Sequence, residues 1–225
     1  MKAPLESTIV SSPVALLADV HGNLRALEAV LAELARRDVT EIYVAGDLLF
    51  GGDEPLATWK RLTAARAHCV RGLSDTALAT LDPAVMTPRS DAETARLTQF
   101  FETRAAVGEL VLKYLERLPP TLRIPLVDGR EVVVVHGSPA DPTVEMSHDM
   151  SDDELLTLLG DDPADIVACG GSHVPFQRDV EGARILGLGS VGASPEGGVA
   201  HFAILTPRLE GTVVEQCWVR WDGAA

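Results

Sequence analysis

Asp19 and His21 are the first residues of the chain whose types and spacing could do chemistry. They are separated by one residue and follow the apolar run Val14–Ala18. In a strand, residues i and i+2 project to the same side, so this carboxylate and this imidazole could bind the same ion or group at the strand's C-terminal end. A metal ion suits that pair. A strand-end Asp followed by a capping His also occurs in structural loops, so the rest of the chain must decide.

Four more acids and histidines follow strand-like apolar runs in the same way. They are Asp47 after residues 41–45, Asp75 after residues 68–71, His136 after residues 131–135 and His173 after residues 166–169. Consecutive strands of a β-α-β unit are usually parallel neighbours, which predicts that Asp19 and Asp47 lie side by side. Each residue could instead cap its own loop, but that coincidence would have to recur at every strand end. A mixed carboxylate and imidazole set favours Mn, Fe, Zn or Ni over a purely oxygen-seeking ion.

Helices and strands alternate among the elements that must position these residues. Asn23 is a good N-cap for a helix over residues 23–37, and a second helix is predicted over residues 56–67. Ser90 and Glu93 form a capping box that opens a long helix over residues 90–118, which Gly108 could break in two. The aromatic residues of that helix fit the core or a cap over the cleft.

The second half of the chain is rich in strand patterns. Asp128-Gly129 between two apolar runs predicts a hairpin, and Ser151 with Glu154 predicts a short helix that ends at Leu159. Further strands are expected over residues 166–169, 184–188, 199–205 and 213–221. The complete pattern indicates the α/β class.

Composition limits the function classes. The 225 residues, 46% of them hydrophobic, suit a single domain over residues 1–225. The net charge of −14 argues against non-specific nucleic-acid binding, which depends on Lys and Arg. The apolar runs are too short to cross a bilayer and no secretory signal is evident, so we expect a cytoplasmic protein without membrane contact. Cys69, Cys169 and Cys217 are expected to be buried free thiols.

Taken in order, these residues resemble the calcineurin-like metallophosphoesterases, in particular their small bacterial single-domain members. That family carries the blocks Asp-x-His, Gly-Asp, Gly-Asn-His-Asp, His and Gly-His-x-His, and the chain matches their order and approximate spacing over roughly residues 14–220. The resemblance implies two mixed β-sheets packed as a sandwich and flanked by helices, in a four-layer α/β/β/α arrangement. The metal site would lie at strand ends on one edge, and the segment around residues 90–118 would be a helical cap.

The resemblance also implies which residues bind metal. The first ion would be held by Asp19, His21, Asp47 and His173, and all four are present. The second ion would share Asp47 and add His136, together with two ligands that this chain lacks.

Catalytic and substrate-binding roles follow from the same resemblance. Asp47, His136 and Asp75 would form the catalytic group, and Asn23 and His136 would contact the substrate. The substrate would be a small phosphorylated molecule. Its identity and the oligomeric state of the protein are not specified by the sequence.

Three positions depart from the family blocks. Leu73 stands at the Asn of Gly-Asn-His-Asp, Ser74 at its His, and Gly171 at the first His of Gly-His-x-His. Leucine offers no lone pair and glycine no side chain, so a second ion would keep too few protein ligands for a tight site. We therefore expect one divalent transition metal and an empty second site. The missing imidazole also removes a general acid, and Asp75 has nothing obvious to orient.

Two functions stay open. The first is a metal-dependent phosphoesterase-type hydrolase of phosphate mono- or diesters, mononuclear and weak. The alternative is a catalytically inactive relative that binds a phosphorylated ligand or partner. The intact first ligand set favours the hydrolase, whereas the three departures favour the alternative. Among the remaining histidines, His68 and His201 fit core or edge positions, and His148 fits a solvated loop near the cleft.

Overall fold

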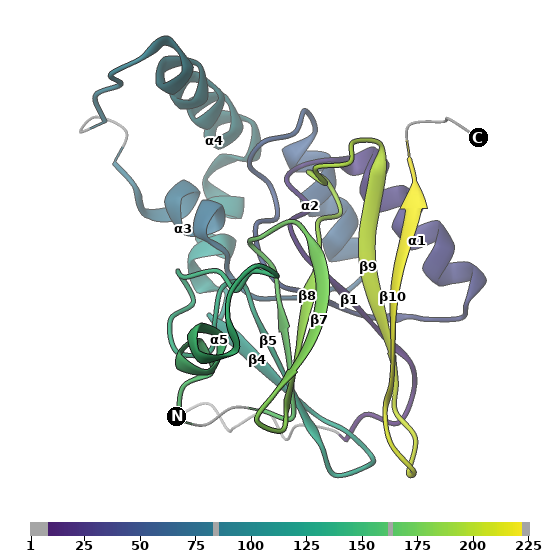
Figure 1. The fold of residues 1–225 in the computed structure, drawn as a ribbon. Helices are drawn as coiled ribbons and strands as arrows, with labels where there is room; N and C mark the ends of the chain where they lie inside the picture. Colours follow the sequence, from purple (N-terminus) through teal and green to yellow (C-terminus); the bar gives the residue numbers. More distant parts are fainter. Residues whose placement is uncertain (1–8, 83–85, 162–163, 222–225) are drawn as a thin grey trace, which may run out of the picture.

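Two five-stranded sheets form the centre of the molecule, and the computed structural model describes residues 9–82, 86–161 and 164–221 (Figure 1). The first sheet has the order β10-β9-β1-β2-β3, formed by β1 (Val14–Leu17), β2 (Glu41–Val44), β3 (His68–Cys69), β9 (Val199–Thr206) and β10 (Val213–Arg220). The second has the order β4-β5-β6-β8-β7, formed by β4 (Thr121–Pro125), β5 (Glu131–Val135), β6 (Ile166–Cys169), β7 (Pro175–Val180) and β8 (Ala183–Leu188). The helices are α1 (Leu24–Arg36), α2 (Pro55–Ala64), α3 (Leu73–Thr80), α4 (Asp91–Arg117) and α5 (Asp152–Leu159).

Strand alternation builds four layers. Leu16 of β1 packs with Val134 of β5 in the core between the sheets, whereas its neighbour Leu17 packs in the core that contains residues of α1, α2 and α4. On the second sheet, Val133 faces away from the first sheet and packs with Leu155 of α5. Because both faces of each sheet are covered, the central strands are continuous apolar runs rather than alternating ones. The predicted four-layer α/β/β/α sandwich is therefore confirmed.

Parallel pairing directs four strands toward one edge. β1 pairs with β2 in parallel, with Leu17 opposite Val44, and β5 pairs with β6 in parallel, with Val135 opposite Cys169. The carboxyl ends of parallel strands meet at the same edge of a sheet. The chain leaves that edge through the segments that carry the predicted site residues.

Most predicted elements are confirmed within a few residues. The Asp128-Gly129 hairpin joins β4 and β5, and Gly108 interrupts α4 with a φ of 73°. The three cysteines are buried and free. None of the helices in the described ranges combines the length and apolar character that crossing a bilayer requires.

The helix α3 and the strand β7 were not predicted. The strand predicted to run to Arg71 ends at Cys69, and Asp75 lies in the first turn of α3 rather than at a strand end. Gly72, whose lack of a side chain gives no N-cap signal, begins that helix. The strand β7 begins at a proline and carries several polar residues, so it lacks the apolar run on which strand prediction depends.

The edge opposite the site is held together by Asp128. Its Oδ2 accepts hydrogen bonds from the backbone N–H and the hydroxyl of Thr212, both 2.8 Å away, and from Arg130 Nε at 2.8 Å. These bonds join the β4–β5 hairpin to the loop before β10, and so they link the two sheets. Burial acts to raise the pKa of Asp128, but the hydrogen bonds from Arg130 and Thr212 outweigh it and lower the pKa to about 2.

We expect Asp128→Asn to lower the free energy of unfolding at pH 7 by about 1–2 kcal/mol, since the side chain is 4% exposed and a pKa unit corresponds to about 1.4 kcal/mol. A carboxyl whose pKa is depressed in the folded state stabilises above its unfolded pKa and loses that contribution as the pH falls through the folded one. The difference between variant and parent should therefore shrink between about pH 4 and pH 2 in urea titrations. The exposed Glu102→Gln is the control, and an undiminished difference at pH 2 would contradict the assignment.

Candidate metal centre

Four of the predicted ligands have unusual backbone conformations. Asp19, His21, Asp47 and His173 have φ values of 54°, 50°, 53° and 59°. Asp and His adopt this left-handed region more readily than most residues, yet each instance costs free energy that the surrounding structure must supply. All four lie in the loops that leave the site edge of the sheets. Strain of this kind clusters at functional sites.

Asp19 is the centre of the cluster. Its side chain is fully buried, and Oδ2 accepts a hydrogen bond of 3.0 Å from the backbone N–H of Gly171. No described group donates a hydrogen bond to Oδ1. That oxygen lies 3.5 Å from His173 Nε2, 3.8 Å from His136 Nδ1 and 3.9 Å from His21 Nε2. A buried carboxylate oxygen without a donor requires a nearby positive charge.

The three histidines are oriented by backbone carbonyls. Nδ1 lies 2.7 Å from Phe50 O in His21, 2.9 Å from Ala45 O in His136 and 3.1 Å from Ala193 O in His173. A carbonyl can only accept, so Nδ1 carries the proton and each Nε2 of the neutral ring keeps its lone pair. Metal-binding histidines are held in this way.

The Nε2 atoms, which keep their lone pairs, lie close to other candidate ligands. His21 Nε2 lies 3.0 Å from His173 Nε2, and His136 Nε2 lies 3.5 Å from Asp47 Oδ1. Two lone pairs at such a distance repel unless a cation or proton lies between them. The donor set therefore fits a divalent transition metal.

The cluster divides into two groups of ligand atoms. Asp19, His21 and His173 form one, and Asp19, Asp47 and His136 form the other, with the atoms of each group within 4.8 Å of one another. All five predicted ligands are thus brought together from both sheets. Asp19 belongs to both groups. That two ions would share Asp47 stays a prediction.

The electrostatics of the cluster show an excess of negative charge. Burial, followed by repulsion from Asp47, raises the pKa of Asp75 to about 7. Burial acts to lower the pKa of His136, but Asp47 and Asp19 outweigh it and raise that pKa. The pKa of His173 is raised chiefly by the nearby carboxylate of Asp19, whose Oδ1 lies 3.5 Å from its Nε2. A bound cation would balance these carboxylates.

Asp75 holds the backbone beside Asp47 in place. Its Oδ1 accepts a hydrogen bond from Leu48 N and its Oδ2 one from Gly72 N, both of 3.0 Å. Asp47 lies within this framework, with its Oδ1 accepting from Ser74 N at 2.8 Å. A Cβ on Gly72 would lie 2.2 Å from that oxygen, so only glycine allows the approach. Asp75 thereby positions Asp47, and its catalytic role stays a prediction.

Asn23 begins α1 beside the cluster. Its Oδ1 accepts a hydrogen bond from Ala26 N and its Nδ2 donates one to Gly192 O, both of 3.0 Å. The predicted N-cap is therefore confirmed. Both polar atoms of the amide are occupied by these bonds, and contact with a substrate stays a prediction.

Of the three departures, Leu73 and Gly171 offer no side-chain ligand atom, and Ser74 offers a hydroxyl in place of an imidazole. Leu73 is 50% exposed at the start of α3, and the Ser74 hydroxyl is buried without a partner among the described residues. Gly171 has a φ of 81°, and a Cβ there would lie 3.2 Å from Glu145 Cβ. An imidazole at this position would be strained and crowded.

The remaining histidines lie outside both groups of ligand atoms. His68 is exposed on the edge strand β3 and stacks on Tyr43. His201 is buried in β9, and His148 is exposed in its loop.

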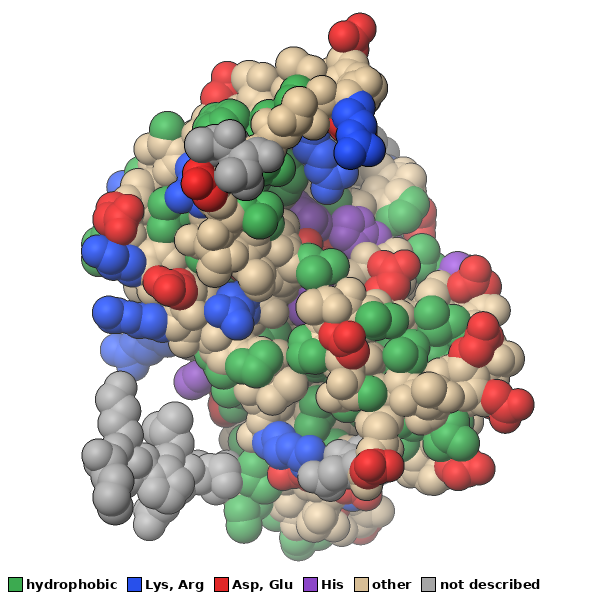
Figure 2. Space-filling view, turned by 90° about the vertical axis from the view of Figure 1, so that its left-hand side faces the viewer, with side chains coloured by type: hydrophobic (Ala, Val, Ile, Leu, Met, Phe, Trp, Pro, Cys, Tyr) green, Lys and Arg blue, Asp and Glu red, His purple; other side chains and the backbone are tan. Residues whose placement is uncertain are grey.

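Two clefts open beside the cluster. The larger, of about 540 Å³, has Asp47 and Ser74 in its lining, and the smaller, of about 410 Å³, has His21 and His173. Figure 2 shows histidine side chains inside a hollow on this side of the molecule, with basic side chains beside it. Residues of α4 line both clefts.

Arg96 of α4 is a residue that sequence reasoning did not identify. It lines both clefts, and Phe50 is the other residue they share. Its place three positions after Glu93 in a helix expected to cap the cleft is a weak signal, because no motif surrounds it.

Comparison with known proteins agrees with the resemblance. The sequence profile of the calcineurin-like phosphoesterase superfamily domain matches residues 13–209. The uncharacterized protein MJ0912 of Methanocaldococcus jannaschii is 25% identical over 185 residues, which cover 81% of this chain and 71% of that protein.

Solved structures give the same result. A metallophosphoesterase from Sphaerobacter thermophilus is 25% identical, with 92% of this chain and 88% of that chain covered and a TM-score of 0.70. The hypothetical protein PH1004 from Pyrococcus horikoshii OT3 is 24% identical, with coverages of 94% and 89% and a TM-score of 0.75. The second likeness concerns the fold alone.

We expect Asp19→Asn to abolish the rise in melting temperature that Mn²⁺ produces, because this residue contributes to both groups of ligand atoms. The metal-free variant should melt no lower than the metal-free parent, since the substitution removes a buried charge whose Oδ1 receives no hydrogen bond from a described group. Differential scanning calorimetry with and without Mn²⁺ measures both quantities. His148→Gln, outside the cluster, should keep the full metal response. A large loss of stability in the metal-free Asp19→Asn variant would show that the residue is structural.

Proposed function

The chain belongs to the calcineurin-like phosphoesterase superfamily, and on that premise we propose that it is a metal-dependent phosphoesterase that hydrolyses small phosphate mono- or diesters. The observation that carries the proposal is the Asp19-centred cluster, in which three oriented histidines and two carboxylates converge beside an open cleft. A structural role would not require such ligands to face a cleft.

One divalent transition metal would be held by Asp19, His21 and His173, with Asp47 and His136 beside it. When bound, such an ion supplies Lewis-acid polarisation of a phosphoryl oxygen and favours deprotonation of water at neutral pH. Mn, Fe, Zn or Ni suits the mixture of imidazole and carboxylate. The second ion site of the family is proposed to be empty because Leu73 and Gly171 provide no ligand atom.

Residues of this chain would position the phosphate of a substrate. The carbonyl of Ala45 holds His136 with its Nε2 toward Asp47, at the floor of the larger cleft. A phosphate that reaches the cluster would therefore lie where the two clefts meet. Ser74 stands where the family has an imidazole, and a serine hydroxyl does not protonate a leaving group at neutral pH. Turnover should accordingly be slow and should favour esters with good leaving groups.

A binding function without turnover is the second candidate. It is favoured by the departures at Leu73, Ser74 and Gly171, which all affect the same half of the centre. In that case the protein would hold a phosphorylated ligand or partner. For either function we propose a cytoplasmic location, which the three free buried thiols support because such thiols are typical of reducing compartments.

We expect Mn²⁺-dependent turnover of 4-nitrophenyl phosphate or its diester, and a loss of at least about 10²-fold in kcat/KM in Asp47→Asn. That carboxylate is both a ligand candidate and part of the cleft wall, and removing such a group typically costs this much. Glu102→Gln, on the exposed surface of α4, should keep the parent rate. Metal and phosphate binding without turnover above the Asp47→Asn level would instead support the second candidate.

We expect the double substitution Leu73→Asn with Ser74→His to raise aryl phosphodiester turnover by about 10²-fold, the lower end of a general acid's usual contribution. Leu73 is exposed and the Ser74 side chain has no partner to lose, so the fold should tolerate both changes. The gains should be non-additive, because an acid has little to act on without the ligand. Leu73→Asn with Ser74→Ala is the matched control. Equal rates for the two double variants would refute the idea that the imidazole is what the centre lacks.

A further inference from the structure

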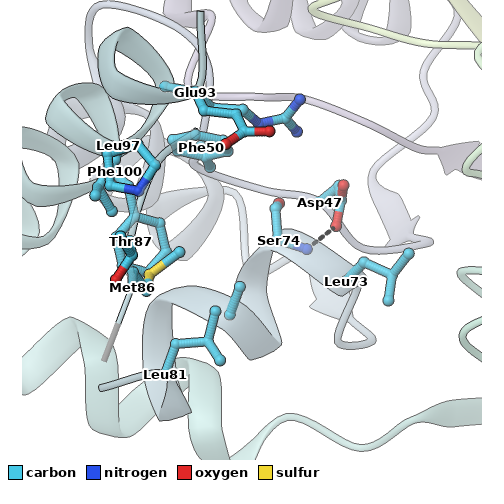
Figure 3. Close-up of a pocket in the computed structure, with 13 residues that line it drawn as sticks. Asp47, Phe50, Leu73, Ser74, Leu81, Met86, Thr87, Glu93, Leu97 and Phe100 are labelled. Atoms are coloured by element: carbon cyan, nitrogen blue, oxygen red, sulfur yellow. Dashed lines mark hydrogen bonds between the residues drawn. The ribbon is translucent and has the colours of Figure 1, made fainter. Parts of the chain in front are cut away.

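The larger cleft combines a charged floor with largely apolar walls. Asp47 and Ser74 lie at the end next to the metal centre, and the opposite wall carries Phe50, Leu97, Phe100 and Met86, as Figure 3 shows. Its volume of about 540 Å³ lies within the range of about 300–1,000 Å³ that is usual for small-molecule sites.

Apolar side chains are exposed around this cleft without a packing reason. Leu73, Leu81 and Met86 are 50%, 42% and 37% exposed. The wall that carries Leu73 and Leu81 is fixed to α4, since Arg104 donates hydrogen bonds to the carbonyl oxygens of Leu78 and Leu81 at the end of α3. A preformed, partly apolar hollow beside a reactive centre is typical of a substrate pocket.

The charged side chains that line the cleft differ in whether they already have a partner. Apart from Asp47, only Glu93 and Arg96 carry charge among its lining residues. Glu93 accepts a hydrogen bond of 2.6 Å from Arg89 N at the start of α4. Arg96 has no ion pair with a described acid, and its guanidinium lies 5.7 Å from the centroid of the Phe50 ring. Arg96 is therefore the cation that a bound anion would meet.

The position of Arg96 selects which part of a ligand it would contact. It lines the larger cleft with Asp47 and the smaller cleft with His21 and His173, so it lies between two clefts that each contain candidate metal ligands. An arginine there matches the geometry of a phosphate, to which it can donate two parallel hydrogen bonds. It supplies charge but no proton, because a guanidinium does not deprotonate in proteins.

We infer that the protein acts on phosphate esters whose ester group is aromatic, that this group occupies the larger cleft, and that Arg96 binds the phosphate. The inference rests on the proposed function and extends it to a substrate class. An aromatic group would lie against Phe50 and Phe100, whose rings already meet edge to face with centroids 6.0 Å apart. The smaller cleft, lined by Asn23, Asp53 and Gln99, is more polar and would remain hydrated.

Phosphonates test the inference without turnover, because their P–C bond is not hydrolysed. Calorimetric titration of the full chain with Mn²⁺ would compare 1-naphthylmethylphosphonate with methylphosphonate. We expect the aromatic phosphonate to bind at least about tenfold more tightly, which corresponds to about 1.4 kcal/mol, since its ring removes apolar surface from water when it enters the cleft.

Matched variants separate the two parts of the ligand. Leu81→Glu and, as a second substitution in the same cleft, Met86→Glu should remove the preference for the aromatic phosphonate. Leu110→Glu, at a 75% exposed position beyond Gly108 on α4, should not. Arg96→Gln should weaken both phosphonates by about tenfold, as loss of a charge-assisted hydrogen bond does, whereas Arg89→Gln should weaken neither.

Three results would overturn the inference. They are equal affinity of the parent for both phosphonates, an unchanged preference in both cleft variants with intact thermal transitions, and unchanged affinity in Arg96→Gln. If any of them accompanies Mn²⁺-dependent turnover of 4-nitrophenyl phosphate, the phosphoesterase proposal stands and only the substrate class is wrong. Absence of both phosphonate binding and turnover would refute the two together.

Discussion

The rest of the site depends on one constraint, the burial of the Asp19 carboxylate. An ion of this size loses several kcal/mol of solvation when it is buried, and within the described ranges only one of its two oxygens receives a hydrogen bond. The surrounding residues lie close to both of its oxygens. A Cβ at Gly170 would lie 2.9 Å from Asp19 Oδ2, so a glycine is required at this position. Three imidazoles approach the other oxygen, Oδ1. A bound cation would make this arrangement favourable.

This constraint also explains why two sheets are needed. Asp19 and Asp47 leave the first sheet, whereas His136 and His173 leave the second, so the ligand atoms meet only if the sheets keep their separation and register. The core between the sheets supplies that rigidity along their length, and Asp128 with Thr212 closes the far edge. The strained backbone at Asp19, His21, Asp47 and His173 is then held by contacts that involve many other residues.

The sequence predicts those parts of the structure that local chemistry specifies. Buried strands such as Val132–Val135, the capping box at Ser151 and the turn at Asp128-Gly129 each carry their own signal, and the residues that end the strands reveal the ligand set. The helix α3 carries no such signal, because a glycine begins it and an acid that supports Asp47 occupies its first turn. The assignment of Arg96 to both clefts depends on how α4 packs on α3, and the sharing of Asp19 depends on how two sheets meet. Neither is a property of a short segment.

The departures from the family blocks gain a second meaning from the cleft. Leu73 removes a ligand from the second half of the centre, and the same side chain lines the larger cleft with an exposed apolar surface. Ser74 removes an imidazole, and its smaller side chain leaves room beside Asp47 at the floor of that cleft. A loss of ligands through disuse would leave no reason for an apolar wall to accompany it, or for an arginine that forms no ion pair with a described acid. If the inferred substrate class is right, the substitutions are an exchange, in which apolar contact with the ester group and the charge of Arg96 would replace a second cation and an acid.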